Sequence, residues 1–503
     1  MSALLPLALV TGLVWSCVLA LAASPLVPVL AVWAICSIYG PGTVTWEWAG
    51  KTVSPDRLAI GWLAAFVLIR TVVHRGQHLE IRDRSLLSLG LFGLLCLVQL
   101  TLYQWNPLPW DEMPPGIRLS YLLGMPIVMY LAVQQRGGLS RREVNLLLVV
   151  LWGFGTYLAA TAIFEKLGVT ALVFPRHILR PRQLYLGRPV GPFLSTPLLG
   201  TMLLICLAAT ILFLRRVGGI LRLVCLVTVP LFAAAILFTQ TRSVWLGCVG
   251  VLWILLFAMS RHSLRYGLIC VGIVAAVIGA VVAGAEFLNP QRIEGAELVE
   301  FSFLQRLALL DGAITLFLKR PIFGWGFGQF ERAVNESVGG GVLGFWATGA
   351  AIGLSSHNLA LRVLAETGLV GAFLFGSVWW MWLKRAWLLT RSRNDVRTTV
   401  GLLTLCAAAA YWSEGMFHDP SYQPAGTLTV ALLAGLCHAL GKHTRPAGPR
   451  WEPVLAAAGS QLPVRRHGPL SHATGDFAVQ TLAERWSGRS DGSNRSGRSV
   501  RSD

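Results

Sequence analysis

Charged residues are scarce in this sequence. Only 13% of its 503 residues are Asp, Glu, Lys or Arg, whereas a soluble domain carries about 25%. Hydrophobic residues make up 54% of the chain, and the mean hydropathy is +0.61. This balance excludes a soluble globular enzyme, and it also excludes a disordered or fibrous protein. We therefore compare the sequence with the bilayer, which a helix of about 20 apolar residues crosses.

The sequence also lacks the residue patterns of metal and nucleotide sites. All nine cysteines lie inside apolar runs, where cysteine is usually a small packing residue. No His/Cys cluster has the spacing of metal ligands, no Walker A sequence is present, and no spaced Asp-x-Asp occurs in the outer loops. We expect no disulfide framework, no metal and no cofactor. Any chemistry is then left to arginine and histidine.

Thirteen apolar runs predict membrane-spanning helices. The runs are continuous and show no period-two alternation, which is typical of helices in lipid. The first run has no basic residues before it, so we expect it to be retained rather than cleaved as a signal. The predicted fold is an all-α polytopic membrane protein with about 12–13 transmembrane helices, although a total of fourteen also fits. The runs lie at about 3–23, 25–40, 58–73, 85–103, 115–133, 146–163, 194–214, 220–238, 243–259, 266–285, 359–383, 398–417 and 425–441.

The distribution of Lys and Arg predicts the orientation. If every run spans once, five short loops rich in Arg and Lys fall on one side, which is then cytoplasmic. The opposite side holds loops 104–114 and 414–424, which contain no Lys or Arg. The net charge of +18 is therefore explained by topology, and we expect no nucleic-acid partner.

Three regions follow from this count. Residues 1–164 are N-terminal transmembrane helices, and residues 165–441 are the membrane region that carries the candidate site. Residues 442–503 are rich in Arg, Ser and Gly and cannot bury a core, so we expect a disordered cytoplasmic tail. This tail is suited to contact anionic lipid headgroups, but a solvated tail without a specific partner fits its composition equally.

Two outer loops break the charge pattern. Loop 165–193 and the long loop 286–358 each hold five basic residues although they lie on the side expected to be outside. Long loops cross the membrane regardless of charge, which is one explanation. The other explanation is an anion-binding surface outside the membrane.

Three side chains in or beside these loops are candidates for chemistry. His357 stands at the outer start of a predicted span, and histidine is the side chain best suited to take a proton near neutral pH. Arg242 and Arg306 are cations close to the same side, where such residues are often functional. A helix-capping histidine and arginines that only reach toward the membrane surface are the alternatives.

A predicted helix and a glycine-rich turn surround Arg306. Residues 301–318 have apolar residues at helical spacing, with Arg306 and Asp311 as the charges, so we expect a short amphipathic helix near the outer interface. The turn after it contains Gly324 and Gly326, whose N–H groups are suited to contact a phosphate. A plain flexible turn is the alternative. A dinucleotide fingerprint is rejected because no strand precedes these glycines.

These pieces, in this order, resemble the O-antigen ligase and polymerase family. The strongest part runs from Arg306 through Pro321-Ile322-Phe323-Gly324-Trp325-Gly326 and His357-Asn358 to Glu366-Thr367-Gly368-Leu369-Val370-Gly371. Supporting pieces are Gly187-Arg188-Pro189-Val190-Gly191-Pro192-Phe193 and Thr239-Gln240-Thr241-Arg242. The resemblance covers residues from about 185 to 435, and it leaves the first 180 residues and the tail unmatched.

The resemblance implies an activity and a location. Family members resemble metal-independent, inverting glycosyltransferases that move a glycan from undecaprenyl pyrophosphate to an acceptor on the outer face of the bacterial inner membrane. Arg242, Arg306 and His357 match the family's essential arginines and histidine, and Arg188, Gly324, Gly326 and Asn358 are the expected substrate-binding residues. The implied partners are the lipid-linked glycan donor, a lipid or glycan acceptor such as lipid A-core, and the membrane lipids.

Other functions stay open at this point. A polymerase that joins lipid-linked repeat units shares the same motifs. A membrane transporter also has many spans, but the predicted spans hold almost no carboxylates in their centres, which counts against ion coupling. A non-catalytic partner in an envelope assembly is a third possibility. Replacement of His357 separates the enzyme from the last two.

Overall fold

A computed structural model describes most of the apolar part of the chain. It describes residues 26–39, 46–48, 51–73, 83–103, 113–134, 139–179, 187–260, 296–336 and 356–442. All of them belong to one compact unit, Met1–Pro446. The predicted runs 3–23 and 266–285, and nearly all of the predicted tail, lie outside the described residues.

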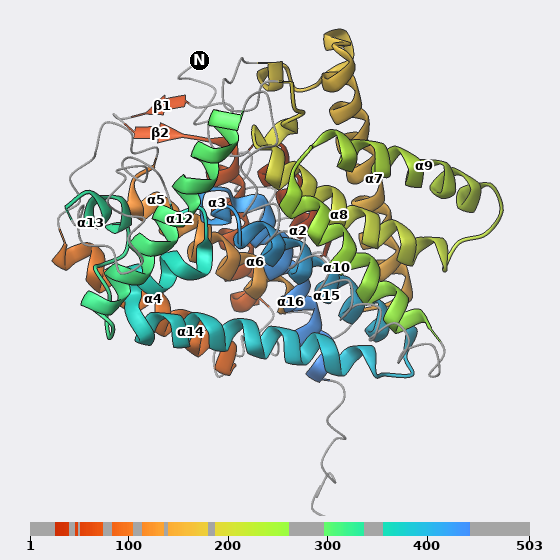
Figure 1. The fold of residues 1–503 in the computed structure, drawn as a ribbon. Helices are drawn as coiled ribbons and strands as arrows, with labels where there is room; N and C mark the ends of the chain where they lie inside the picture. Colours follow the sequence, from red (N-terminus) through yellow and green to blue (C-terminus); the bar gives the residue numbers. More distant parts are fainter. Residues whose placement is uncertain are drawn as a thin grey trace, which may run out of the picture. The chain divides into compact units, whose positions relative to one another are not determined.

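The described part is almost entirely helical, which confirms the predicted all-α class (Figure 1). A short antiparallel hairpin, not predicted from the sequence, pairs Trp46 with Val53. Its strands are β1 (Trp46–Trp48) and β2 (Lys51–Val53). The helices are α2 (Leu26–Ile38), α3 (Pro55–Val73), α4 (Arg84–Leu102), α5 (Pro115–Leu119), η1 (Ser120–Gly124), α6 (Met125–Gln134), α7 (Arg141–Leu167), η2 (Thr170–Leu172), η3 (Arg176–Leu179), η5 (Gly191–Phe193), α8 (Thr196–Leu214), α9 (Gly219–Phe238), α10 (Arg242–Met259), α12 (Ala296–Lys319), α13 (Phe330–Glu336), α14 (Leu359–Thr390), α15 (Asp395–Gly415), η7 (Pro420–Tyr422) and α16 (Pro424–Lys442).

The apolar runs correspond closely to these helices. Eleven of the thirteen predicted runs coincide with a described helix, since α5, η1 and α6 form one continuous segment. Within the described residues, seven helical segments are long and apolar enough to cross a membrane, and α2 and α10 are apolar but shorter. The seven are Arg84–Leu102, Pro115–Gln134, Arg141–Leu167, Thr196–Leu214, Gly219–Phe238, Leu359–Thr390 and Pro424–Gly441. The chain is an integral, polytopic membrane protein.

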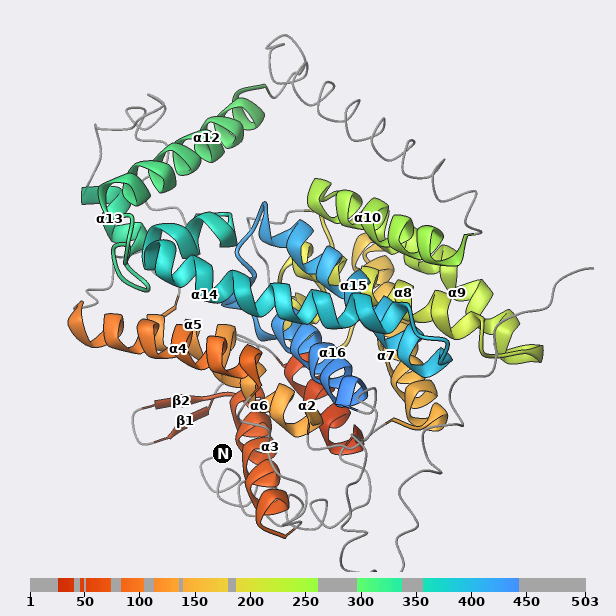
Figure 2. The same ribbon diagram turned by 90° about the horizontal axis from the view of Figure 1, so that it is seen from below.

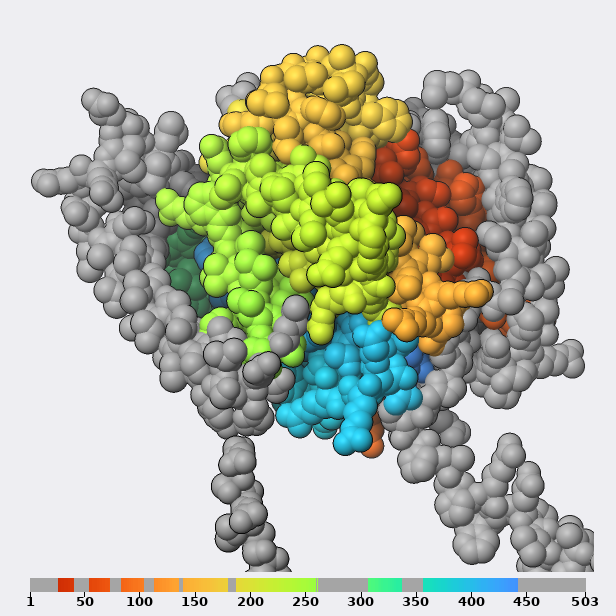
Figure 3. Space-filling view, turned by 90° about the vertical axis from the view of Figure 1, so that its right-hand side faces the viewer, coloured from red at the N-terminus to blue at the C-terminus, as the bar shows by residue number. Residues whose placement is uncertain are grey.

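The position of a helix in the bundle follows from its neighbours. Helices α8 and α16 are apolar on all sides and almost completely buried, as expected for central helices. Figure 2 shows α10, α15 and α8 side by side, with α14 crossing beside α15 and α16. By contrast, α9 and α10 expose large apolar side chains such as Leu223, Val227 and Val249. Figure 3 shows this part of the chain (yellow-green) at the surface of the molecule. An apolar face of this kind suits contact with lipid tails.

Ion pairs join helix ends that the distribution of Lys and Arg predicts to lie on the same side of the membrane. Arg385 of α14 pairs with Asp83, which precedes α4, and the hydroxyl of Tyr130 donates to the same carboxylate at 2.7 Å. Arg216, after α8, pairs with Asp395 at the start of α15. All these ends belong to loops predicted to be cytoplasmic. The structure therefore agrees with the predicted alternation of the spans.

Candidate functional site

His357 is held at the start of α14 by the residue that follows it. Its backbone has φ +47°, a left-handed conformation that is uncommon for a residue other than glycine. The Asn358 side-chain oxygen accepts a hydrogen bond from the N–H of Leu361 at 3.0 Å and so caps the helix. The Asn358 amide also donates to the carbonyl of Met416 at 3.0 Å. The backbone that carries His357 is thus held where α14 begins and α15 ends.

A second histidine, not singled out from the sequence, lies beside the first. The ring centroids of His357 and His418 are 6.3 Å apart, with the rings nearly perpendicular at 84°. The N–H of His418 donates to the carbonyl of Glu414 at 2.8 Å, which continues the end of α15. Loop 414–424 was noted above only for its lack of Lys and Arg. A histidine in a loop expected to face the same side as His357 was the available signal.

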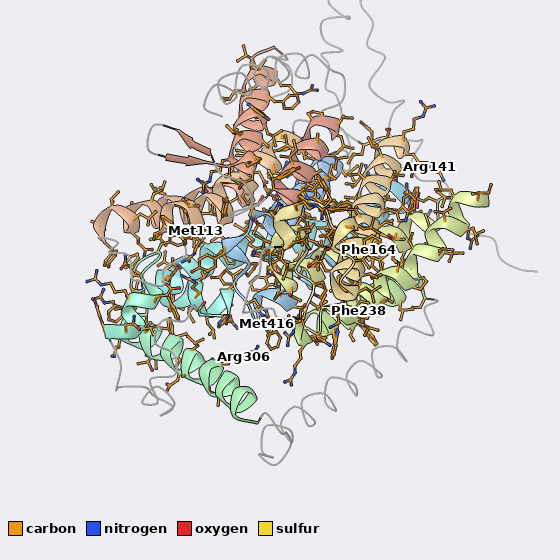
Figure 4. The ribbon with its side chains drawn as sticks, turned by 90° about the horizontal axis from the view of Figure 1, so that it is seen from above. Met113, Arg141, Phe164, Phe238, Arg306 and Met416 are labelled. Atoms are coloured by element: carbon orange, nitrogen blue, oxygen red, sulfur yellow. The ribbon has the colours of Figure 1, made fainter. Side chains whose placement is uncertain are left out.

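Arg306 acts electrostatically on both histidines, and Arg242 acts on Arg306. Arg242 is the first residue of α10, Arg306 lies in α12, and both side chains are exposed. Partial burial of Arg306 and the positive charge of Arg242 both lower the pKa of Arg306. No carboxylate of the described residues forms an ion pair with either guanidinium. Two like charges that converge without a counterion form a good anion-binding site. Figure 4 shows Arg306 and Met416 on one side of the molecule, away from Arg141.

The electrostatic surroundings keep both imidazoles neutral. Burial, followed by the positive charges of Arg306 and Arg362, holds the pKa of His357 below its ordinary value of 6.5, and Asp419 opposes this effect. For His418, burial and the nearby His357 and Arg306 lower the pKa to about 3. A neutral imidazole is able to accept a proton, so His357 has the charge state required of a base.

A buried network of two arginines and three carboxylates supports this region. Arg118 pairs with Glu366 through both of its terminal nitrogens. Arg362 Nε donates to Glu366 Oε1 at 3.0 Å, its Nη1 to Asp419 Oδ2 at 3.1 Å, and its Nη2 lies 2.7 Å from Glu331 Oε1. We call these five residues the Arg118–Arg362 network. It joins α5, α13, α14 and the loop before α16, and two of its members, Arg362 and Asp419, act electrostatically on His357.

Two carboxylates of this network, Asp419 and Glu331, lie outside the predicted spans, and their pKa values are shifted in opposite directions. Burial alone would raise the pKa of Asp419, but Arg362 and Arg118 hold it below its usual range. Burial raises the pKa of Glu331, although Arg362 opposes the shift. The hydroxyl of Tyr422 donates to Glu331 at 3.2 Å. Asp419 is therefore a stable negative charge between His418 and Arg362.

The glycine-rich turn packs against α14. The N–H of Gly326 donates to the carbonyl of Glu366 at 2.8 Å, and that of Gly324 donates to the carbonyl of Arg320 at 3.1 Å. A Cβ on Gly324 would lie 2.4 Å from the backbone of Glu366, and one on Gly368 would lie 2.3 Å from the carbonyl oxygen of Ile322. These glycines permit a close approach of two backbones. This geometry corrects the prediction that the N–H groups of Gly324 and Gly326 face a phosphate, because both groups already have partners.

The helix predicted before this turn is longer than expected. It is present as α12, which begins at Ala296 and ends at Lys319. Of its two predicted charges, Arg306 is exposed, whereas Asp311 is completely buried. Only Arg306 is therefore available to the open side of the site.

Arg188 lies in the loop that precedes α8. Its side chain is exposed. The carboxylate of Glu165 accepts hydrogen bonds from the N–H groups of Val190 and Gly191, both at 2.9 Å. These contacts hold the loop against the end of α7. No hydrogen bond or ion pair of the described residues joins Arg188 to the histidine pair, so its role as a substrate-binding residue stays a prediction.

Comparison with known proteins relates part of the chain to a family. Residues 226–376 match a family model described as O-Antigen ligase. The matched segment contains Arg242, Arg306, His357 and Glu366, and Arg188 and His418 lie outside it. No curated protein matches the chain. Within residues 226–376 this chain is therefore similar to the O-antigen ligase family.

Proposed function

We propose that this membrane protein transfers a glycan from undecaprenyl pyrophosphate to an acceptor hydroxyl, with inversion and without a metal ion. The observation that carries the proposal is that Arg306 of α12 is close enough to act electrostatically on His357, just before α14, and is itself influenced by Arg242 of α10. Two cations without a carboxylate partner among the described residues stand beside a neutral imidazole. The family match supports glycosyl transfer of the O-antigen ligase type in general.

The arginines are suited to the leaving group. When the acceptor oxygen attacks the anomeric carbon, the bond to the pyrophosphate breaks and negative charge grows on the leaving oxygen. Guanidinium groups bind phosphate oxygens with charge-assisted, often bidentate hydrogen bonds. Arg242 and Arg306 then stabilise the developing charge, a part that a metal ion plays in many other enzymes. Loss of one such preorganised donor typically lowers the rate by about 10²–10³.

His357 is suited to the proton. The acceptor hydroxyl loses its proton as its oxygen bonds to the anomeric carbon, and a neutral imidazole in contact with it accepts that proton. Binding of the donor changes the field at His357. The pyrophosphate neutralises the two arginines, so the pKa of His357 rises and the imidazole becomes a stronger base once the donor is bound.

The proposed location follows from the predicted orientation. The site lies on the outer face of the bacterial inner membrane, and the C-terminal tail lies in the cytoplasm. The donor's lipid chain remains among the membrane lipids while its glycan reaches the site from the outer side. Lipid A-core or another surface glycan or lipid is the proposed acceptor. A polymerase, whose acceptor is a second lipid-linked repeat unit, is the alternative within the same chemistry.

Reconstituted transfer tests the proposal. Purified protein in detergent receives an undecaprenyl-pyrophosphate oligosaccharide and EDTA, and candidate acceptors are added one at a time. A single shift of lipid A-core on a gel indicates a ligase, and a ladder on the lipid carrier indicates a polymerase. Absence of any product from folded protein favours transport or assembly instead, and a requirement for a divalent metal contradicts the proposed role of the arginines.

Matched variants separate the site from its surroundings. Arg306→Ala is expected to lower transfer by about 10²–10³. Arg332→Ala is the control, because Arg332 is another exposed arginine of the same region and pairs with Glu336 on α13. An exposed pair of this kind adds little stability. Equal losses in the two variants would contradict the assignment of Arg306.

A further inference from the structure

We propose that His418 binds the acceptor hydroxyl together with His357, so that the two imidazoles form the binding subsite of the attacking oxygen. This inference rests on the proposed glycosyl transfer and adds the residue that holds its acceptor. His418 lies outside the segment that matches the family model. The inference therefore depends on the geometry of the loop between α15 and α16.

The separation of the rings fits one shared oxygen atom. A direct hydrogen bond between two imidazole nitrogens requires ring centroids within about 5.3 Å, given an N···N distance of about 3 Å. One oxygen that bonds to both rings allows centroids about 6–7 Å apart. The observed centroid distance is 6.3 Å. The pair is too far apart for a direct bond and correctly spaced for a bridging hydroxyl.

Both rings have nitrogens without a hydrogen-bond partner among the described residues. No hydrogen bond within the described part of the chain reaches a nitrogen of His357, whose side chain is partly buried. His418 Nδ1 is buried without a partner among the same residues. Polar ring atoms in a partly buried site usually have a hydrogen-bond partner. A hydroxyl between the rings supplies a partner to one nitrogen of each histidine.

The backbone holds His418 firmly from both sides. On one side its own N–H donates to Glu414 of α15. On the other side Asp419 accepts a hydrogen bond from the N–H of Ser421 at 2.9 Å and one from Arg362 at 3.1 Å. Arg362 in turn belongs to the Arg118–Arg362 network. A contact to an attacking atom needs this kind of fixed support, because small misplacements cost large factors in rate.

The two histidines have different parts in the transfer. The acceptor oxygen accepts a hydrogen bond from His418 Nε2–H and gives its own proton to His357. A lone pair of the same oxygen forms the new bond to the anomeric carbon. The bond from that carbon to the pyrophosphate breaks, and its electron pair stays on the leaving oxygen. His357 then releases its proton to the pyrophosphate or to water. The strongly lowered pKa of His418 agrees with a ring that stays neutral throughout.

Acceptor kinetics test this assignment. The purified full chain is compared with His418→Ala, His418→Gln and the control Met416→Ala, which alters an exposed side chain of the same loop. His418→Ala is expected to lower kcat/KM for the acceptor about tenfold, the value of one hydrogen bond, while binding of a labelled undecaprenyl-pyrophosphate oligosaccharide is unchanged. His418→Gln restores part of the loss because its amide also donates, and Met416→Ala retains the wild-type rate.

The outcomes separate this inference from the proposed function. If the wild-type protein transfers no glycan, the proposed function fails and this inference fails with it. If the wild type transfers glycan and His418→Ala has the wild-type kcat/KM for the acceptor, only this inference is overturned. An equal loss of donor binding and thermal stability in His418→Ala and His418→Gln also overturns it, because His418 would then support the fold rather than the acceptor.

Discussion

At the scale of single residues, the site depends on the charge state of His357. Its imidazole is partly buried, and burial disfavours the charged form. Arg306 and Arg362 add positive charge, and only Asp419 opposes them. The neutral ring is the form that accepts a proton from the acceptor. The same arginine that is proposed to bind the donor therefore also controls the basicity of the histidine.

The dependence of transfer on pH tests this coupling. For the wild type, kcat/KM for the donor should stay level down to the ordinary histidine value of 6.5 and fall only below it, because the pKa of His357 is lowered. Arg306→Gln removes a positive charge, so the pKa of His357 rises and the fall begins at a higher pH. The measurement is kcat/KM for the donor as a function of pH, in the wild type and in Arg306→Gln. A fall that begins at the same or a lower pH would contradict the coupling.

A second prediction concerns the Arg118–Arg362 network. Glu366 is completely buried and accepts hydrogen bonds from both arginines. Glu366→Gln leaves two buried guanidinium groups with less compensating charge, and loss of one partner of a buried pair costs about 3–5 kcal/mol. We expect a large fall of the thermal unfolding midpoint in detergent. Glu336→Gln, which alters the exposed pair with Arg332, is the control and should change stability by less than about 1 kcal/mol.

At the scale of elements, a backbone contact joins the turn after α12 to α14. The N–H of Leu369 donates to the carbonyl of Pro321 at 2.8 Å, and the N–H of Trp325 donates to that of Ala365 at 3.0 Å. Gly368 has φ +64° and interrupts the helical geometry inside α14 at this contact. The contact sets where α12 lies against the first turns of α14. It therefore fixes the segment that carries Arg306 relative to the helix that follows His357.

Substitution of Gly368 should weaken the backbone contact between α14 and the turn after α12. Gly368→Ala introduces a Cβ 2.3 Å from a carbonyl oxygen at a left-handed residue. The conformation alone costs about 1–2 kcal/mol, and the clash adds to it. We expect a lower unfolding midpoint together with a lower transfer rate. Gly376→Ala in the same helix is the matched control, since a Cβ there meets no atom within 4 Å. Equal behaviour of the two variants would contradict the proposed role of the contact.

The sequence was sufficient to predict the helices but not the side-chain contacts between them. Continuous apolar runs predicted the helices because lipid and a buried core both select for such runs. The pairing of Arg118 with Glu366 spans 248 residues, and no local pattern encodes a contact of that kind. Arg118 nevertheless stood alone as a cation within an apolar run, which is a recognised sign of function or of a buried partner. His418 lies in a loop predicted to face the same side as His357, but no local pattern shows that the two rings are adjacent.

At the scale of the whole molecule, the account depends on which side of the membrane each helix end occupies. The structure joins the ends near Asp83, Arg216, Arg385 and Asp395 through ion pairs. The opposite ends carry Met416 and the histidine pair. The excess of Lys and Arg at the first set of ends predicts that this set is cytoplasmic. The site then faces outward.

Cysteine labelling tests the orientation. Arg393→Cys lies in the loop between α14 and α15, and Met416→Cys lies beside the site; both side chains are exposed. In intact cells whose outer barrier has been opened, a membrane-impermeant maleimide should label Met416→Cys. Arg393→Cys should react only after the inner membrane is disrupted. The wild type gives the background of the native cysteines. Reversal of this pattern would place the site in the cytoplasm and contradict the account.

The most direct test of the central claim separates donor binding from glycan transfer in the same purified protein. Binding of a labelled undecaprenyl-pyrophosphate oligosaccharide and its transfer, with EDTA present, are measured for the wild type, His357→Ala and the double variant Arg242→Ala/Arg306→Ala. The account predicts that His357→Ala binds the donor as the wild type does but transfers no glycan, whereas the double variant loses both. Normal transfer by folded His357→Ala, or normal donor binding by the double variant, would contradict it.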